Sequence, residues 1–183
     1  NVDALFKEQA QLQAEVDLAD VRGQSVAKKA MEIAAAGFHN MLMTGPPGTG
    51  KSMLAKCLPG IMPPLSFEES MEVSAVYSVA GMLGEGQPLV LRRPFLQPHH
   101  SITRAALVGG GIVPMPGQIS LAHRGVLFLD ELPEFGREQL DLLRQPIEDH
   151  EVTIVRQSGS YRYPSRFIML GACNPCPCGH YPD

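Results

Sequence analysis

The sequence predicts an α/β protein in which helices flank a parallel sheet. Three apolar runs carry this prediction, and each of them ends in residues suited to a functional site. The first run, Met41–Thr44, leads into a glycine-rich loop and then a helix. The second ends in the carboxylates of Asp130 and Glu131, and the third ends in the amide of Asn174. Buried parallel strands are nearly continuous apolar runs, and ligands bind at their carboxyl ends, so we expect the three ends to meet in one cleft.

Length and composition indicate one domain. The chain has 183 residues and a net charge of −4, which gives no general reason to expect a polyanionic partner. No apolar run approaches the roughly 20 residues that cross a bilayer, and no signal peptide opens the chain. We therefore expect a cytoplasmic protein without a membrane partner. Residues 1–19 are interpreted as a linker or the tail of an upstream domain, and residues 20–183 as the domain itself.

Two helices outside the glycine-rich region can be placed by their ends. The residues Gly23-Gln24-Ser25 begin a helix with apolar residues at helical spacing, and Gly37 is suited to its C′ position. The residues Ser66-Phe67-Glu68-Glu69 form a capping box, which predicts a second helix over residues 67–79.

The glycine-rich loop has the composition of a phosphate-binding loop, and a chance match is expected in only about one per cent of such sequences. Gly45 and Gly50 allow backbone conformations closed to residues with a Cβ, so that N–H groups can turn inward around a phosphate. Lys51 can reach the β- and γ-phosphates of ATP, and the Ser52 hydroxyl can bind Mg²⁺. The residues expected to contact the nucleotide are Gly45, Pro46, Pro47, Gly48, Thr49, Gly50, Lys51, Ser52 and Met53.

The second and third apolar runs supply the remaining candidates. A strand over Val126–Asp130 would place Asp130 where it can hold Mg²⁺ and Glu131 where it can deprotonate a water. An Asp–Glu pair alone is often just solvated, but the nearby phosphate loop favours the functional interpretation. A strand over Phe167–Ala172 leads to Asn174, which could position the water. A turn-forming Asn before a proline fits this spacing at least equally well.

The chain resembles the magnesium-chelatase-like AAA+ ATPases, and within them the ComM-type competence proteins. The resemblance extends from residue 20 to the end and rests on AGFHNMLMTGPPGTGKS, LPGIMPPL, RPFLQPHHS, ISLAHRGVLFLDELPEF, LRQPIEDHEVTI and ACNPCPCG. It implies a P-loop NTPase core of the AAA+ type with inserted β-hairpins. By this resemblance residues 45–52 are Walker A, Asp130 and Glu131 are Walker B, and Asn174 is sensor 1. ATP and Mg²⁺ would be the cofactors, with Lys51, Glu131 and Asn174 catalytic and Ser52 and Asp130 holding the metal.

The resemblance also implies a ring, commonly a hexamer, that uses ATP to remodel DNA during transformation and recombination. The alternative is the ATPase subunit of a magnesium chelatase, which the CNPCPCGH and PPGTGKS strings favour less. A simple kinase or switch protein would not explain the hairpins. Nine residues follow Asn174, so the C-terminal lid, the arginine finger and sensor 2 are not assigned. We expect this fragment to be monomeric and to hydrolyse ATP slowly. Arg144 and Arg166 are the candidates for an arginine finger within these residues.

Charge placement gives an independent argument for a nucleic-acid partner. Residues 86–129 and 152–182 contain no Asp or Glu, yet they hold seven arginines. The family places two hairpins toward the ring pore, and residues 107–113 and 155–161 look like those hairpins. Arginines in acid-free stretches of this kind can neutralise the phosphates of a nucleic acid without recognising its base sequence. Pairing across subunits or with other helices is nearly as plausible for these side chains. The expected DNA contacts are Arg92, Arg93, Arg104, Arg156 and Arg162.

Four residues near the end of the chain have metal-ligand chemistry: Cys173, Cys176, Cys178 and His180. Cys173 belongs to the third apolar run, where we expect it to point into the core. The other three are an incomplete set for zinc, which requires four ligands in a structural site. Metal binding here is the less favoured interpretation.

Overall fold

The computed structural model describes residues 16–84, 86, 89–157 and 159–175. Among these residues, no helix combines the length and the apolar character needed to cross a membrane. In chain order the elements are η1 (Leu18–Asp20), α2 (Ser25–Gly37), β1 (Met41–Thr44), α3 (Lys51–Ile61), α4 (Phe67–Val79), β2 (Phe95–Leu96), α5 (Arg104–Val108), β3 (Gly109–Gly110), β4 (Met115–Pro116), α6 (Gln118–Leu121), β5 (Val126–Leu129), η2 (Leu132–Glu134), α7 (Arg137–Asp141), α8 (Arg144–Asp149), β6 (Glu151–Arg156), β7 (Gly159–Pro164) and β8 (Ile168–Cys173).

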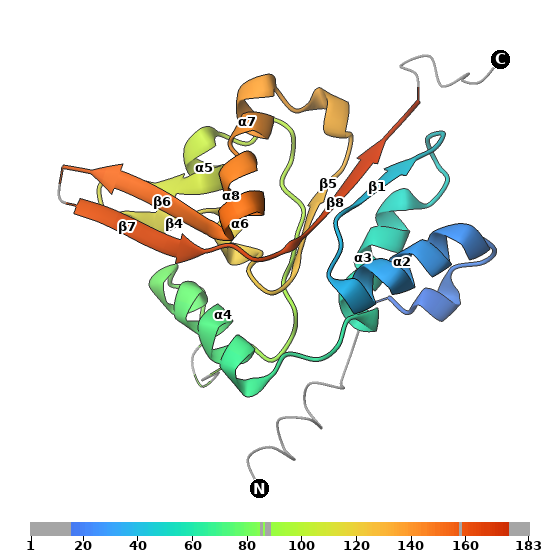
Figure 1. Cartoon of the computed structure of the whole chain (residues 1–183), viewed down its shortest axis with the longest axis horizontal. Coiled ribbons are helices and arrows are strands. Elements are labelled where there is room, and N and C mark those ends of the chain that lie inside the picture. Colours follow the sequence, from blue (N-terminus) through green and yellow to red (C-terminus); the bar gives the residue numbers. More distant parts are fainter. Residues whose placement is uncertain (1–15, 85, 87–88, 158, 176–183) are drawn as a thin grey trace, which may run out of the picture.

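A four-stranded parallel sheet forms the centre of the molecule, in the order β1-β8-β5-β2 (Figure 1). Met41 pairs with Leu170, Val126 with Ile168, and Phe95 with Val126. The α/β prediction with three parallel strands is therefore confirmed. Three strand bounds differ by one residue: β5 stops at Leu129, and β8 begins at Ile168 and continues to Cys173.

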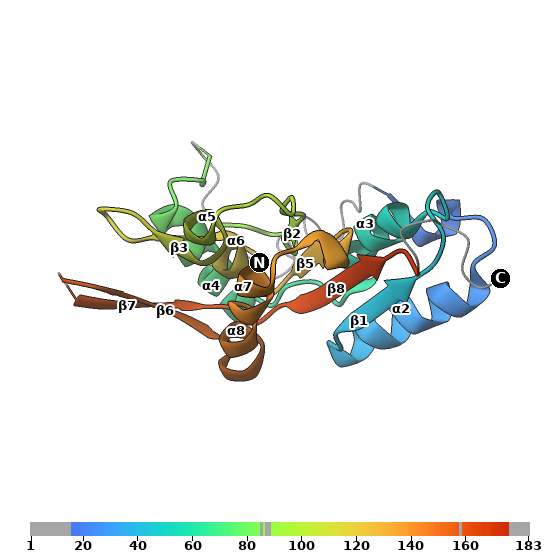
Figure 2. The ribbon, with the colours of Figure 1, turned by 90° about the horizontal axis from the view of Figure 1, so that it is seen from above.

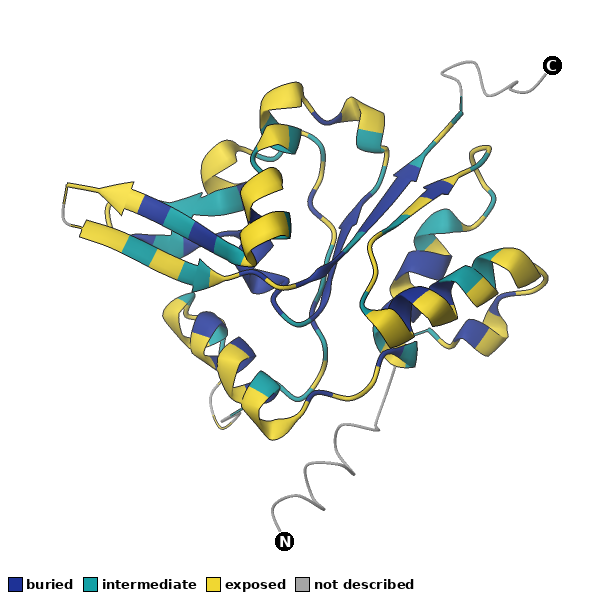
Figure 3. Ribbon diagram, in the orientation of Figure 1, coloured by how far each residue is buried: buried dark blue, intermediate teal, exposed yellow. Residues whose placement is uncertain are grey.

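The two faces of the sheet contribute to two separate hydrophobic cores. Strand β5 is buried throughout (Figure 3), and its side chains alternate between the faces. Val126 and Phe128 belong to the core that includes α2 and α3, whereas Leu127 and Leu129 belong to the core beneath the second hairpin. Leu18, which precedes the expected domain boundary at residue 20, is buried in the first of these cores.

Two antiparallel hairpins extend from one end of the sheet (Figure 2). We call them together the hairpin arm: β3–β4, residues 109–116, and β6–β7, residues 151–164. The Tyr163 hydroxyl donates to the carbonyl of Pro114 at 2.7 Å, and the Arg156 guanidinium lies against Gly110. The predicted inserts are confirmed, but the first was placed too early. Residues 107 and 108 end helix α5, and the hairpin begins at Gly109.

Of the two predicted helix ends, the capping box is confirmed and the C′ glycine is wrong. Ser66 accepts from the Glu69 N–H and the Glu69 carboxylate accepts from the Ser66 N–H, so the capping box is confirmed. The C′ assignment of Gly37 is wrong, because Gly37 is the last helical residue and Phe38 adopts the left-handed conformation with φ 55°. The His39 ring lies over Gly37 and fills the space that a Cβ would need there.

An ionic network with two buried members, Arg93 and His123, joins α4 to the segments before β2 and β5. Glu72 accepts hydrogen bonds from His123 Nε2 at 3.1 Å and from Arg124 Nε at 2.8 Å, and Glu69 pairs with Arg93 at 3.0 Å. His123 Nδ1 accepts from the backbone N–H of Arg166, so the ring is neutral with its proton on Nε2. Burial lowers the pKa of His123 below its ordinary value, and the Glu72 carboxylate partly offsets this effect.

The folded chain should therefore lose stability when His123 is protonated. Because the folded-state pKa is depressed, this contribution is fully present above pH ~6.5 and is lost as the pH falls through the folded-state pKa, at up to about 1.4 kcal/mol per pH unit. His123→Asn keeps an acceptor near Nδ1 but cannot titrate. Urea unfolding between pH 7.5 and 5 should give a smaller pH slope in the variant. Equal pH slopes in the wild type and the variant would contradict the assignment of this pH dependence to His123.

Candidate functional site

The glycine-rich loop wraps around the N-terminus of α3. Gly48 and Gly50 adopt φ angles of 78° and 83°, in the left-handed region that favours glycine. Gly45 does not, which corrects the expectation that Gly45 needs this freedom. Thr49 Oγ1 donates to the carbonyl of Pro46 at 2.9 Å, and Gln24 Nε2 donates to the carbonyl of Thr49 at 2.8 Å. These two bonds hold the loop in its turned conformation.

Lys51 connects the loop to the end of β8. Its Nζ donates to the carbonyl oxygens of Gly45 and Pro46 at 2.6 and 2.9 Å, and to Asn174 Oδ1 at 3.0 Å. An ammonium has three protons, so this set uses its full donor capacity. The structure thus brings together two residues that are 123 positions apart and were both predicted to serve one site.

Ser52 and Asp130 form a second link, from α3 to the end of β5. The Ser52 hydroxyl donates to Asp130 Oδ2 at 2.8 Å, and Asp130 Oδ1 accepts from the backbone N–H of Glu131 at 3.1 Å. Both side chains are half-buried. A hydroxyl and a carboxylate oxygen adjacent to a phosphate-binding loop are the donor atoms that Mg²⁺ prefers.

Glu131 has an unusual backbone and a solvent-facing side chain. Its φ of 51° places it in the left-handed region, and 60% of its side chain is exposed. His100 Nδ1 lies 3.9 Å from Glu131 Oε2. Sequence analysis missed His100, although a signal existed: it follows β2, which is a fourth parallel strand ending at the same edge of the sheet.

The arginines predicted to contact DNA fall into two groups. Arg93 is a correction: its side chain is only 7% exposed, and it bonds to Glu69 and to the carbonyls of Pro63 and Arg124. It therefore holds α4 in place and does not face a partner. The other four, Arg92, Arg104, Arg156 and Arg162, are exposed.

The remaining candidates are placed only in part. Cys173 is half-buried, and its Sγ lies 3.2 Å from Thr44 Oγ1, while positions 176, 178 and 180 lie outside the described residues. Within the described ranges, no group of three or more His, Cys, Asp or Glu residues could hold a metal. Arg144 is exposed and pairs with Asp141, and Arg166 lies over the ring of Phe38.

Comparison with known proteins identifies a family. Residues 17–183 match the family described as magnesium chelatase, subunit ChlI. The competence protein ComM of Haemophilus influenzae is 52% identical over 167 residues, which are 91% of this chain and 32% of that protein. The magnesium-chelatase 38 kDa subunit of Cereibacter sphaeroides is 28% identical over 170 residues, 84% of this chain and 51% of that protein. The chain spans about a third of the length of the relatives that are more than 50% identical to it.

Solved structures support the fold. The complex between subunits BchI and BchD of magnesium chelatase gives a TM-score of 0.69 at 23% identity, covering 90% of this chain and 56% of the other. NtrX from Brucella abortus in complex with ATP gives 0.56 at 20% identity, covering 97% of this chain and 37% of the other. At these identities the likeness concerns the fold alone.

Alanine substitutions at Gly50 and Gly45 should show that backbone strain at a positive φ, and not a side-chain contact, makes glycine necessary in the loop. Gly50→Ala places a Cβ on a residue with φ 83°, which should destabilise the chain by about 1–2 kcal/mol. Gly45→Ala is the matched control, because its Cβ would meet only Thr49 Oγ1 at an ordinary 3.5 Å. Urea unfolding measures both variants. A larger loss in Gly45→Ala than in Gly50→Ala would contradict this account of the loop.

Proposed function

Because the chain belongs to the magnesium chelatase ChlI family, we propose that it is the ATP-binding and ATP-hydrolysing core of a AAA+ motor that acts on DNA. One observation carries the ATPase proposal. The hydrogen bonds Lys51–Asn174 and Ser52–Asp130 join the phosphate loop to the ends of β8 and β5. A loop, a cation, a carboxylate and an amide converge there from segments far apart in the sequence.

The donor set fits a nucleotide and Mg²⁺. The loop provides backbone N–H groups at the N-terminus of an 11-residue helix, where the helix dipole favours anions. Residues 45–52 and Met53 would surround the phosphates, and Lys51 would exchange its loop carbonyls for phosphate oxygens. Ser52 and Asp130 would hold Mg²⁺, whose remaining ligands are usually phosphates and waters. When bound, Mg²⁺ neutralises charge that develops on the phosphate oxygens.

Hydrolysis needs a base and an orienting group beyond the metal ligands. Glu131 is exposed and directly follows Asp130, so its carboxylate can accept a proton from a water beside the γ-phosphate. Asn174 is held by Lys51 and can orient the same water. We therefore assign Glu131 as the general base, Lys51 as the phosphate-binding cation and Asn174 as the sensor of the γ-phosphate.

DNA is the proposed substrate because of the hairpin arm. Its described residues contain a single acidic side chain, Glu151, which pairs with Arg162 at 3.6 Å, while Arg156 and Arg162 are exposed. The tip of the first hairpin exposes the apolar side chains Ile112 and Val113. Cations beside apolar side chains suit the phosphates and bases of a nucleic acid.

The alternative function is the ATPase subunit of a magnesium chelatase. The family name and the likeness to the BchI–BchD complex support it. The greater identity to the competence protein, 52% against 28%, favours the DNA role. ATPase assays of the full-length protein with single-stranded and branched DNA test the choice. Stimulation by DNA supports the motor, and stimulation only by a metal-free porphyrin with a partner subunit supports the chelatase.

We further propose that the full-length protein assembles as a homo-oligomeric ring, commonly a hexamer in AAA+ proteins. BchI is in complex with BchD in the structural neighbour, which makes assembly through this fold plausible. Sedimentation of the full-length protein with ATP and Mg²⁺ tests the ring, and a monomer at every concentration would contradict it.

Substitutions of Lys51 and Glu131 should impair different steps, ATP binding and ATP hydrolysis respectively. Lys51→Ala should weaken ATP binding by about 10- to 150-fold, because it removes charge-assisted hydrogen bonds to the phosphates. Glu131→Gln should bind ATP normally but lower kcat by about 10²–10⁴-fold, because an amide cannot accept the proton. Titration with ATP and steady-state hydrolysis in the full-length protein measure the two effects. Equal losses of ATP affinity would contradict the separate roles.

Arginines of the hairpin arm should contribute to DNA affinity through phosphates. Arg156→Gln and Arg162→Gln should each weaken binding to all sequences and lower the slope of log affinity against log salt by about 0.7–0.9. Arg137→Gln is the control, because this side chain is 95% exposed on α7, outside the arm. Fluorescence anisotropy at several salt concentrations measures the slope. A loss in the control equal to that in the arm variants would contradict the arm as the contact surface.

A further inference from the structure

Helix α4 carries apolar side chains on its exposed face. Met71 and Val79 are each 51% exposed, and Met82, which follows the helix, is 54% exposed. Their spacing places the three side chains on one side of the helix. The exposed face of a surface helix is normally polar, and a row of exposed apolar side chains marks an interaction site. Methionine is common at such sites because its side chain adapts to the partner.

The inner face of α4 is attached largely through polar groups. Ser70 Oγ donates to the carbonyl of Val90 at 2.6 Å, and Ser74 Oγ accepts from the Val90 N–H at 2.7 Å. Glu69 and Glu72 also face inward, toward the arginines of the ionic network described above. The exposed methionines have no part in this attachment, so they are available to a partner.

The exposed face of α4 is negatively charged as well as apolar. The helix contains three carboxylates and no Lys, Arg or His. Two of the carboxylates belong to the ionic network, and the third, Glu68, is exposed and accepts from the Ser66 hydroxyl at 2.9 Å. Glu68 and Met71 are three positions apart, so they lie on the same side of the helix. A partner for this face should therefore offer an apolar surface beside a cation.

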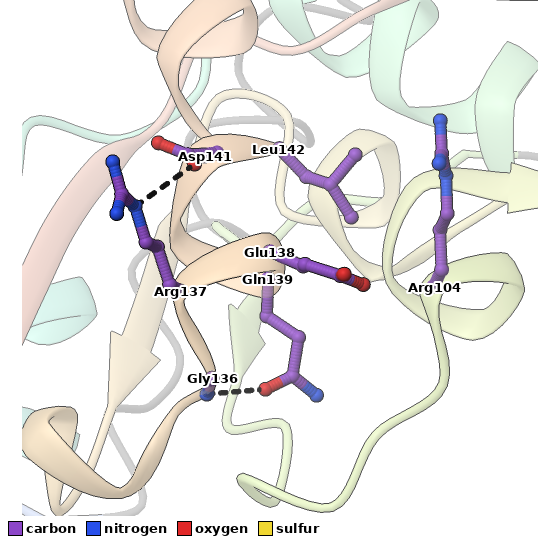
Figure 4. A pocket seen from close by; sticks show the side chains of 7 residues that line it. All are labelled: Arg104, Gly136, Arg137, Glu138, Gln139, Asp141 and Leu142. Carbon is purple, nitrogen blue, oxygen red and sulfur yellow. Dashed lines mark hydrogen bonds and ion pairs between the residues drawn. The ribbon is translucent and has the colours of Figure 1, made fainter.

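An open cavity of about 690 Å³ between α5 and α7 offers both (Figure 4). Gln139 Nε2 donates to the carbonyls of His100 and Ile102, which holds α7 beside the segment that leads into α5. The half-buried Leu142 supplies an apolar part of the lining, and the exposed Arg104 lies on the α5 side. The cavity is therefore built into the fold.

The charges around the cavity are positive on balance. Three arginines, Arg104, Arg137 and Arg144, stand against two carboxylates, Glu138 and Asp141. Asp141 pairs with both Arg137 and Arg144. Within the part of the chain that the structure describes, no carboxylate lies within ion-pair distance of Arg104. Arg104 is thus a cation that can pair with a carboxylate from outside the chain.

The acidic apolar face and the cavity lie on opposite sides of the molecule. Figure 1 shows α4 below the central sheet and α5 and α7 above it. A two-fold contact of α4 with α4 of a second copy would place carboxylates against carboxylates. A head-to-tail contact, from α4 of one copy to the cavity of the next, joins unlike surfaces instead. Contacts of this kind close into a ring when the rotation between copies allows it.

We propose that α4 of one copy docks at the cavity between α5 and α7 of the next copy. Met71 enters the cavity against Leu142, and Glu68 pairs with Arg104. The inference rests on the ring proposed above and names two surfaces that join its subunits. It assigns Arg104 to a contact between subunits and leaves the DNA contacts to the arginines of the hairpin arm.

Substitution of Met71 tests the apolar part of the contact in the full-length protein. Met71→Glu should raise the concentration needed for assembly by about 10- to 100-fold, because it places a second carboxylate in the contact. Met71→Leu should assemble like the wild type. Val26→Glu is the matched control, because Val26 is 84% exposed on α2, outside both surfaces. Sedimentation velocity with ATP and Mg²⁺ measures assembly, and equal losses in Met71→Glu and Val26→Glu would overturn the assignment to α4.

Charge exchange tests the ion pair. Glu68→Arg and Arg104→Glu should each weaken assembly by at least about 1.5- to 5-fold, the value of an exposed ion pair. The double variant should recover most of this loss, because the opposite charges meet again. Both positions are exposed, so thermal midpoints by circular dichroism should stay close to that of the wild type. Single variants that weaken assembly without recovery in the double variant would overturn the pairing.

The outcomes separate this inference from the proposed ring. A wild type that remains monomeric at every concentration overturns the ring and the docking together. A wild-type ring that is unaffected by Met71→Glu and by both charge reversals overturns the docking and leaves the ring in place. If Arg104→Glu assembles normally but loses affinity for DNA, Arg104 is a DNA contact and its assignment to the subunit contact is wrong.

Discussion

Strand β8 lies between β1 and β5, and the geometry of the site depends on this order. The register pairs Thr44 with Cys173 and Leu129 with Gly171, so the three strands end close together at one edge of the sheet. The residues that follow each strand are then neighbours because of the hydrogen-bonded ladder. Lys51 has only to reach across its own loop to contact Asn174, and the Ser52 hydroxyl meets Asp130 from the first turn of α3.

The same ladder explains which residues of the candidate site the sequence could place. Gly48, Gly50, Lys51 and Ser52 are contiguous, and an apolar run ending in carboxylates marks a strand end without any knowledge of the fold. The expected strands were therefore confirmed to within a residue or two at their ends. Their common edge follows from parallel pairing alone, because all parallel strands direct their carboxyl ends the same way.

Contacts that depend on the path of loops could not be predicted in this way. Gln139 bonds to carbonyls 37 and 39 positions away, and no local pattern distinguishes it from a solvated glutamine. Arg93 lies in an acid-free stretch, which favoured an external partner, yet its carboxylate partner on α4 is 24 positions earlier in the chain. A count of charges along the sequence cannot detect a partner that the fold supplies. Phe38 takes the left-handed position expected of Gly37, and the glycine serves instead to leave room for the His39 ring, a contact that no local pattern predicts.

Two segments join the hairpin arm to the site: strand β8, and residues 97–103 with the short helix α5. Strand β8 leads from the end of β7 to Asn174, and its six residues span about 20 Å. Its buried side chains belong to the core on one face or pack against the core on the other, so bending it would disturb both. Residues 97–103 join β2 to α5, and Gln139 Nε2 of α7 donates to the carbonyls of His100 and Ile102 within them. The packing on both faces of β8 therefore fixes Asn174, and with it Lys51, relative to the hairpin arm.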